Sequence, residues 1–172
     1  MSIHNTVRDI LWRFVKERID PNALREQRLE ALRAPSHAAA GEEEDRLDVC
    51  FSYAGKQYNV DVAIVGAHND EARVSAQAST DGAAAREEEQ DKRRRYAGLA
   101  ILPCVFESGG RAGDSAQACV RMLARMAAVD EDEVPAVTAF LWQRVSHGLQ
   151  TAASWQLATV VVRPGLLATA AI

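Results

Sequence analysis

The sequence predicts an α/β fold in which a small mixed sheet is flanked by helices and followed by a C-terminal helical extension. Three observations predict it: an alternating hairpin pattern over residues 46–64, an apolar run over 99–107 that follows a helical segment, and helical patterns from residue 114 onward. A strand that returns after a helix is typical of sheets covered by helices. We expect residues 1–112 to form the core and residues 113–172 to pack on the same domain.

Composition and charge limit the classes of protein to consider. The chain has 172 residues, of which 48% are hydrophobic, and carries a net charge of −4. This length and composition are typical of a single globular domain and not of a disordered chain. No apolar run is long enough to span a membrane, and a signal-peptide pattern is missing, so we expect no membrane partner and an intracellular location. The negative charge argues against bulk attraction to nucleic acid.

The N-terminal segment is predicted as an amphipathic helix over residues 3–19. Its apolar residues recur at helical spacing along one stripe, namely Val7, Ile10, Leu11, Phe14 and Val15. Asp20-Pro21 then has the pattern of an N-cap followed by a proline in the first turn. This pattern predicts a short second helix carrying Leu24, Leu29 and Leu32, with a surface connection over residues 35–44 after it.

The alternating pattern over residues 46–64 predicts a β-hairpin. Two apolar runs of period two flank the turn sequence Ala-Gly-Lys-Gln at residues 54–57. If Tyr53 faces Tyr58 across this turn, Asp48 and Asp61 lie on one face as diagonal neighbours roughly 7 Å apart. The opposite face is entirely apolar and is expected to face the core.

Two interpretations of the paired aspartates remain open. Two carboxylates that converge beside a hairpin are suited to hold a divalent metal through oxygen ligands. Alternatively, Asp48 and Asp61 are solvated outward positions of a hairpin with one buried face. On the hairpin pattern alone, the solvated interpretation is favoured.

The rest of the chain alternates one strand with helices. We expect a long loop over 66–82, a helix over 83–99 with acids first and bases last, and a buried strand over 99–107. Pro103 in that strand favours a sheet edge or a bulge. Helices are then expected from Asp114 or Ser115, from Asp132 and Pro135 to Leu149, and from 151 to 162, with Gly148 breaking or crowding the second of them.

Several short motifs occur in the order in which one nuclease family carries them. They are His4-Asn5-Thr6-Val7-Arg8-Asp9, Arg46-Leu47-Asp48, Val60-Asp61-Val62-Ala63-Ile64, Lys92-Arg93-Arg94-Arg95-Tyr96, the segment 102–110 and the segment 140–146. Together they resemble the restriction-endonuclease-like domain of site-specific non-LTR retrotransposons. That domain belongs to the PD-(D/E)XK nucleases, whose core is a helix, a three-stranded meander, another helix and a further strand.

The chain departs from the family pattern at several positions. Leu47 stands where proline is usual, Arg95 where lysine is usual, and Ala63 where the wider superfamily carries its motif lysine. In the retrotransposon group that lysine lies in the following helix, which corresponds to Lys92. The family's cysteine/histidine knuckle and reverse transcriptase motifs are not in this chain, so we expect a fragment, a stand-alone relative or a diverged copy.

The resemblance implies a metal-dependent endonuclease that nicks target DNA for retroelement insertion in the nucleus. Asp48 and Asp61 would hold Mg²⁺ or Mn²⁺, and Lys92 would complete the catalytic set. Arg46, Arg93 and Arg95 would contact DNA. Reverse transcriptase and RNA-binding regions of a longer polyprotein would be further partners.

The resemblance leaves other polar side chains outside the predicted site. It implies that Glu107 is a further ligand or, preferably, a structural partner, and that Tyr96 packs. The four histidines have no metal-ligand spacing and are interpreted as structural or surface residues, namely His4, His37, His68 and His147.

Two rival functions remain open. The first is a catalytically inactive version of the same fold that serves as a protein or RNA interaction module, as in the endonuclease-like domain of the central spliceosomal scaffold protein. The presence of Asp48, Asp61 and Lys92 favours activity, whereas the negative net charge and the missing proline favour this rival. The second is a helical binding protein with an incidental hairpin.

Overall fold

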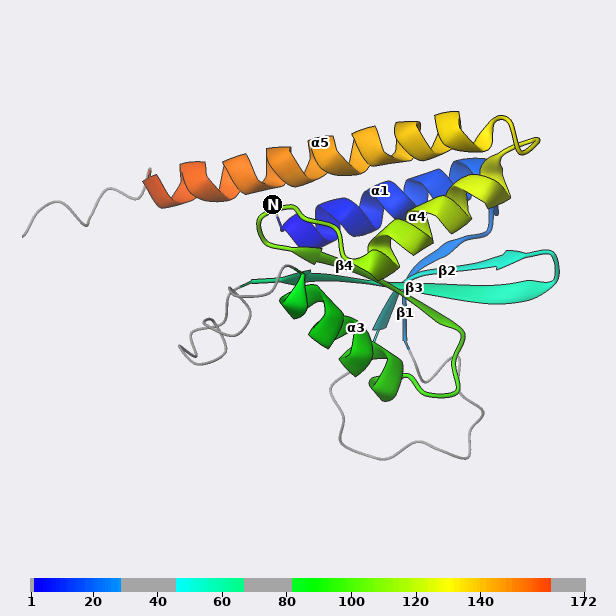
Figure 1. Ribbon diagram of the computed structural model, residues 1–172, viewed down its shortest axis with the longest axis horizontal. Coiled ribbons are helices and arrows are strands. Elements are labelled where there is room, and N and C mark those ends of the chain that lie inside the picture. Colours follow the sequence, from blue (N-terminus) through cyan, green and yellow to red (C-terminus); the bar gives the residue numbers. More distant parts are fainter. Residues whose placement is uncertain (1, 29–45, 67–81, 162–172) are drawn as a thin grey trace, which may run out of the picture.

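The computed structural model describes residues 2–28, 46–66 and 82–161 (Figure 1). In chain order the elements are α1 (Ile3–Arg18), β1 (Leu24–Arg28), β2 (Arg46–Tyr53), β3 (Lys56–Val65), α3 (Ala83–Arg95), β4 (Ile101–Glu107), α4 (Asp114–Ala127) and α5 (Val134–Val161). The predicted α/β class, a small mixed sheet flanked by helices, is confirmed. The predicted connection over 35–44, most of the loop over 66–82 and the tail after 163 lie outside the described residues.

The sheet has four strands in the order β1-β2-β3-β4. The first three strands pair antiparallel, and β4 pairs parallel to β3. Figure 1 shows α1, α4 and α5 on one side of the sheet and α3 on the other. Because β4 is an edge strand of this sheet, Pro103 fits there without removing a ladder hydrogen bond from a central strand.

The segment Leu24–Arg28 forms strand β1, so the prediction of a second short helix was wrong for these residues. The sequence Leu-Arg-Glu-Gln-Arg contains good helix formers, and Leu24 is exposed, so no local pattern indicates a strand. Backbone pairing with β2 decides the structure here, with Arg25 opposite Val49 and Gln27 opposite Leu47.

The hairpin exists as predicted, but its register differs by two residues. Ala54 and Gly55 both have positive φ, at 49° and 75°, which is the requirement of a two-residue type I′ turn. Tyr53 therefore pairs with Lys56, and Phe51 pairs with Tyr58. The predicted four-residue turn and the predicted pairing of Tyr53 with Tyr58 were wrong.

Both faces of the sheet are covered. The α1 stripe, the hairpin, β4, α4 and α5 form the main core, which includes Leu11, Phe51, Phe106, Leu123 and Leu141. On the side of α3, Leu47, Cys50 and Tyr96 form a second buried cluster. The expectation that only one face of the hairpin is buried was therefore wrong. The residues after 112 share the main core with the N-terminal half.

The last helix, α5, runs without a break from Val134 to Val161, so the predicted division into two helices was wrong. Gly148 lies where α1 crosses α5. A Cβ atom at this position would lie 2.4 Å from Ile10 Cδ1 and 3.1 Å from Thr6 Cγ2. The glycine therefore permits a close helix crossing instead of ending the helix. Within the described residues, no helix combines the length and apolarity that crossing a membrane requires.

Candidate functional site

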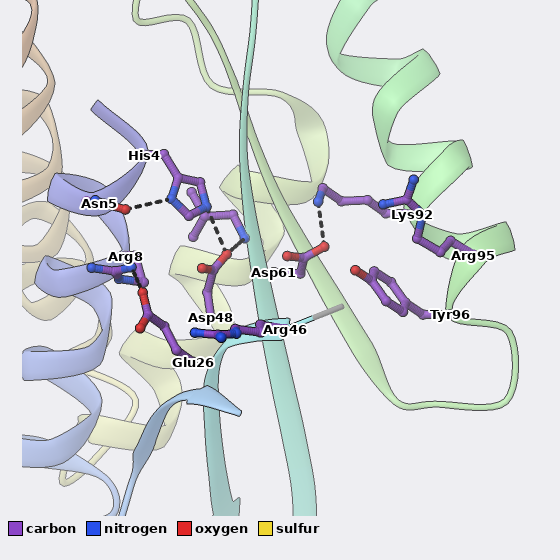
Figure 2. Close-up of a pocket in the computed structure, with 11 residues that line it drawn as sticks. His4, Asn5, Arg8, Glu26, Arg46, Asp48, Asp61, Lys92, Arg95 and Tyr96 are labelled. Atoms are coloured by element: carbon purple, nitrogen blue, oxygen red, sulfur yellow. Dashed lines mark hydrogen bonds and ion pairs between the residues drawn. The ribbon is translucent and has the colours of Figure 1, made fainter. Parts of the chain in front are cut away.

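A cavity of about 650 Å³ opens between α1 and α3 beside the hairpin (Figure 2). Its walls carry the carboxylates of Glu26, Asp48 and Asp61. The basic side chains that line it are His4, Arg8, Arg46, Lys92 and Arg95. Acidic groups therefore lie beside an excess of basic ones, a combination that suits a phosphate bound next to a metal ion.

Asp48 is held where β2 separates from β3. Regular pairing runs to Val49 opposite Val60, and the next positions in this register are Asp48 and Asp61. The Val62 N–H points toward β2, but it donates to Asp48 Oδ2 at 2.7 Å instead of to a backbone carbonyl. The side chain of Asp48 thus replaces a ladder acceptor, and only 6% of this residue is exposed.

Asp61 is paired with Lys92, which α3 supplies from the other side of the cavity. Lys92 Nζ donates to Asp61 Oδ2 at 2.5 Å, and the two residues are 9% and 4% exposed. Glu88, one turn earlier on α3, lies 3.7 Å from the same ammonium. Burial raises the pKa of Asp61 to about 6, opposed by the Lys92 ammonium and increased further by the charge of Asp48. A second cation near this carboxylate would favour its ionised form.

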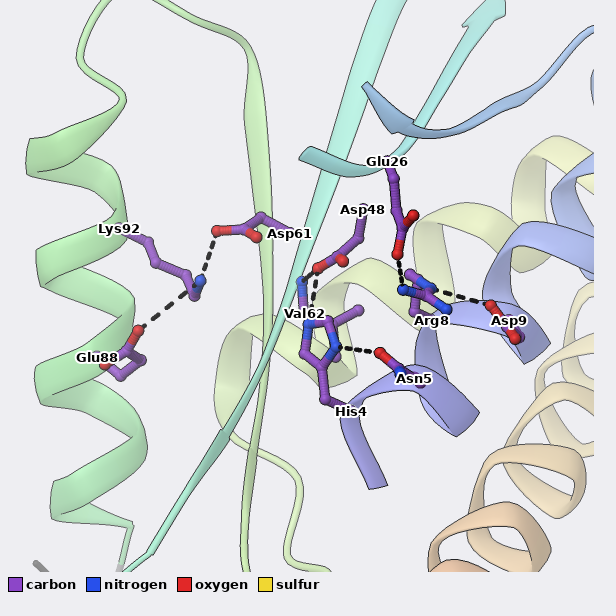
Figure 3. Close-up of polar contacts among 10 residues, drawn as sticks. All are labelled: His4, Asn5, Arg8, Asp9, Glu26, Asp48, Asp61, Val62, Glu88 and Lys92. Atoms are coloured by element: carbon purple, nitrogen blue, oxygen red, sulfur yellow. Dashed lines mark hydrogen bonds and ion pairs between the residues drawn. The ribbon is translucent and has the colours of Figure 1, made fainter. Parts of the chain in front are cut away.

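The trio predicted from the sequence is brought together in one cavity. Asp48, Asp61 and Lys92 all line it, although Lys92 follows Asp61 by 31 positions and Asp48 by 44. The solvated interpretation of the two aspartates was wrong, because both are buried. The predicted arrangement on one face also differs from the structure. In Figure 3 Asp61 is directed toward α3 and Asp48 toward α1, on either side of β3.

His4 lines this cavity. The sequence predicts only a structural or surface residue at this position. Its Nε2 lies 3.2 Å from Asp48 Oδ2, and its Nδ1 lies 3.2 Å from Asn5 Oδ1. The hydrogen bond to Asp48 raises the pKa of His4, opposed by burial and supported by the negative charge of Asp48. One signal was available in the sequence: His4, Arg8 and Leu11 fall at helical spacing on the side of α1 that faces the sheet.

Arg8 and Glu26 extend the network toward β1. Arg8 is 7% exposed, and its guanidinium donates to Glu26 and, at 2.9 Å, to Asp9. Glu26 has a left-handed backbone with φ of 56°, and the β1–β2 register places it opposite Asp48. A positive φ at a residue other than glycine is uncommon in a strand and marks a local distortion beside the site. Because a helix was predicted for this segment, Glu26 was not among the predicted site residues.

The three predicted DNA-contacting arginines do not lie together. Arg46 and Arg95 line the cavity. Arg93 lies on another side of α3, where it lines a separate groove of about 420 Å³ together with Arg86 and Ser115.

The other side chains considered from the sequence have different places. Tyr96 lines the cavity and packs on Leu47 and Cys50. Glu107 ends β4, where its N–H donates to the Arg111 carbonyl at 2.8 Å, and it does not line the cavity. His147 is exposed on α5, whereas His37 and His68 lie outside the described residues.

The donor set of the cavity fits a hard divalent cation. Within the described ranges, no group of three or more histidine, cysteine, aspartate or glutamate side chains has a metal-binding arrangement. Mg²⁺, however, commonly binds through only one or two carboxylates and keeps several water ligands. Asp48 and Asp61 supply two such carboxylates in a cavity with room for water.

Comparison with known proteins assigns no family: no protein-family model matches the chain, and no curated protein matches it.

Proposed function

We propose that this protein is a metal-dependent endonuclease domain of the PD-(D/E)XK type, which hydrolyses phosphodiester bonds in retroelement target DNA. One observation carries the proposal: Asp48, Asp61 and Lys92 converge in a single cavity from a hairpin and a separate helix. Two carboxylates can hold a divalent metal for phosphodiester hydrolysis, and an amine beside them can stabilise the negative charge that develops on the phosphate.

The order of the elements supports the same proposal. Helix α1, the antiparallel strands β1, β2 and β3, helix α3 and strand β4 follow one another in the described chain. The nuclease core that the sequence motifs resemble has a helix, a three-stranded meander, a helix and a strand in this order. Sequence patterns missed strand β1, which is the first strand of that meander and completes the set of three.

Each residue of the cavity has a defined role in the proposed reaction. Asp48 and Asp61 would hold Mg²⁺ or Mn²⁺, which when bound polarises the phosphate and lowers the pKa of a coordinated water. Lys92 is placed to orient the attacking water or to neutralise the negative charge that develops on the phosphate. Arg46 and Arg95 would contact backbone phosphates, which positions DNA without reading its sequence.

A plasmid-nicking assay tests the proposal. Supercoiled DNA incubated with the protein and Mn²⁺ or Mg²⁺ should become nicked, and chelator should prevent this. Asp48→Asn and Asp61→Asn should abolish nicking, because each removes a charged metal ligand while nearly keeping the shape of the side chain. The matched control is Asp132→Asn, the same change at an exposed aspartate before α5, which should nick at the wild-type rate.

The ion pair between Lys92 and Asp61 also favours a second candidate. A buried pair at 2.5 Å satisfies both charges without any ligand, as a purely structural pair would. In that case the fold acts as an inactive protein or RNA interaction module. Calorimetry with Mn²⁺ separates the two candidates: a folded wild-type protein that releases no binding heat and does not nick DNA would leave only the interaction module.

A further inference from the structure

One oxygen of Asp48 receives contacts from two different elements, β3 and α1. The Val62 N–H approaches Asp48 Oδ2 from β3 at 2.7 Å, and His4 Nε2 approaches the same atom from α1 at 3.2 Å (Figure 3). Two contacts on Oδ2 fix the plane of the carboxyl group.

The direction of the hydrogen bond from His4 follows from its partner. An ionised carboxylate only accepts hydrogen bonds, so Nε2 of His4 must carry the proton. Nδ1 faces the Asn5 amide, whose oxygen and nitrogen can exchange places by rotation. Asn5 can therefore face this ring nitrogen in either protonation state, and the contact between Nε2 and Asp48 persists in both.

We propose that His4 is a positioning residue that orients Asp48 for binding the divalent metal, an inference that rests on the proposed nuclease function. Side chains that donate to a metal-binding carboxylate hold it in its coordinating rotamer, and their loss typically weakens metal affinity about 10- to 100-fold. His4 suits this role because α1 places it across the cavity from Lys92, so Asp48 and Asp61 are each held by a different helix.

Two substitutions separate hydrogen bonding from simple filling of space. In His4→Gln the side-chain amide nitrogen can reach the place of Nε2, whereas in His4→Asn the amide reaches only the place of Nδ1. Calorimetric titration with Mn²⁺ at fixed pH measures metal affinity without reference to cleavage. We expect His4→Ala and His4→Asn to weaken Mn²⁺ binding about 10-fold or more, and His4→Gln to retain most of the affinity. The control is His147→Ala, which removes an exposed histidine from α5 and should change nothing.

The outcomes distinguish this inference from the function on which it rests. If wild-type protein binds no Mn²⁺, the proposed function fails. If wild-type protein and His4→Ala bind Mn²⁺ equally well, only the role of His4 is overturned. Equal weakening in His4→Gln and His4→Asn would also overturn it, because a lost hydrogen bond would then not be the cause. Thermal melts in chelator show whether each variant is folded. If His4→Ala is unfolded, the comparison between His4→Gln and His4→Asn decides the role of His4.

Discussion

Lys92 Nζ lies 2.5 Å from Asp61 Oδ2, and both side chains are buried between α3 and the sheet. Removing one partner of such a pair leaves a buried charge without compensation and destabilises the fold. Replacing both partners with uncharged side chains leaves no such charge and costs less. We predict that Lys92→Met lowers the free energy of unfolding by about 3 kcal/mol at pH 8, and that adding Asp61→Asn recovers part of this loss. Urea melts in chelator measure both. If the double variant is no more stable than Lys92→Met, the two side chains are not energetically coupled.

Lys92→Arg keeps the positive charge at the site but changes its shape and its ability to lose a proton. We predict that nicking falls to near background while the free energy of unfolding changes by about 1 kcal/mol or less. The control is Lys56→Arg at the exposed hairpin turn, which should nick normally. Wild-type nicking by Lys92→Arg would remove the amine from the mechanism but leave the two aspartates in place.

Asp48 has a structural task as well as a proposed metal-binding one, because it accepts the buried Val62 N–H. Asp48→Ala leaves this donor without its acceptor and should destabilise the metal-free protein by about 1–3 kcal/mol. Asp48→Asn keeps a side-chain oxygen and should cost less, although both variants should lose Mn²⁺ binding. Equal destabilisation by the two substitutions in chelator would show that the hydrogen bond to Val62 contributes little.

The stability of the metal-free protein should depend on the ionisation of Asp61. Burial raises the pKa of this carboxyl from 3.8 to about 6, so between these pH values the folded state binds more protons than the unfolded state. The free energy of unfolding therefore falls as pH rises through this window, by an amount on the order of 2 kcal/mol. Carboxyls remote from the site contribute equally in wild type and Asp61→Asn, so the difference between their urea melts reports Asp61 and its coupling to Asp48. A difference that stays constant from pH 4 to 7 would contradict the prediction.

Gly148→Ala should weaken the packing of α1 on α5. The added methyl would lie 2.4 Å from Ile10 Cδ1 and 3.1 Å from Thr6 Cγ2, so the Ile10 side chain or one of the helices must shift. We predict a loss of about 1–3 kcal/mol in the free energy of unfolding, which is typical of overpacking. Truncating the facing side chain in Gly148→Ala/Ile10→Ala should relieve the clash and lower the additional cost of the alanine. The cost of Gly148→Ala in the free energy of unfolding should be smaller in the Ile10→Ala background than in wild type. If the two costs are equal, the contact with Ile10 does not cause the destabilisation.

Sequence patterns predicted the elements whose own residues carry a strong period. The stripe of α1, the alternation of the hairpin and the apolar run of β4 are of this kind, and all three elements were found. The meeting of Asp48, Asp61 and Lys92 was expected only because the motifs resemble a known nuclease core. Periodicity alone favoured two solvated aspartates, which is wrong.

The features that sequence patterns missed depend on distant partners. Leu24–Arg28 is a strand because β2 pairs with it, not because of its own composition. The turn at Ala54-Gly55 requires a positive φ at alanine, which has no preference for it, so sequence patterns did not indicate a two-residue turn. Gly148 was predicted to break or crowd a helix, and its role is set by Ile10, 138 positions earlier in the chain.

The replacement of a ladder carbonyl by the Asp48 side chain makes one backbone amide a reporter of the site. The protection of the Val62 N–H against exchange with solvent depends on where a carboxylate oxygen lies, not only on strand pairing. Any ligand that draws Asp48 away, or locks it more firmly in place, should alter the exchange rate and the nitrogen and proton chemical shifts of this amide. Occupancy of the cavity could then be followed at a single resonance of the unmodified backbone.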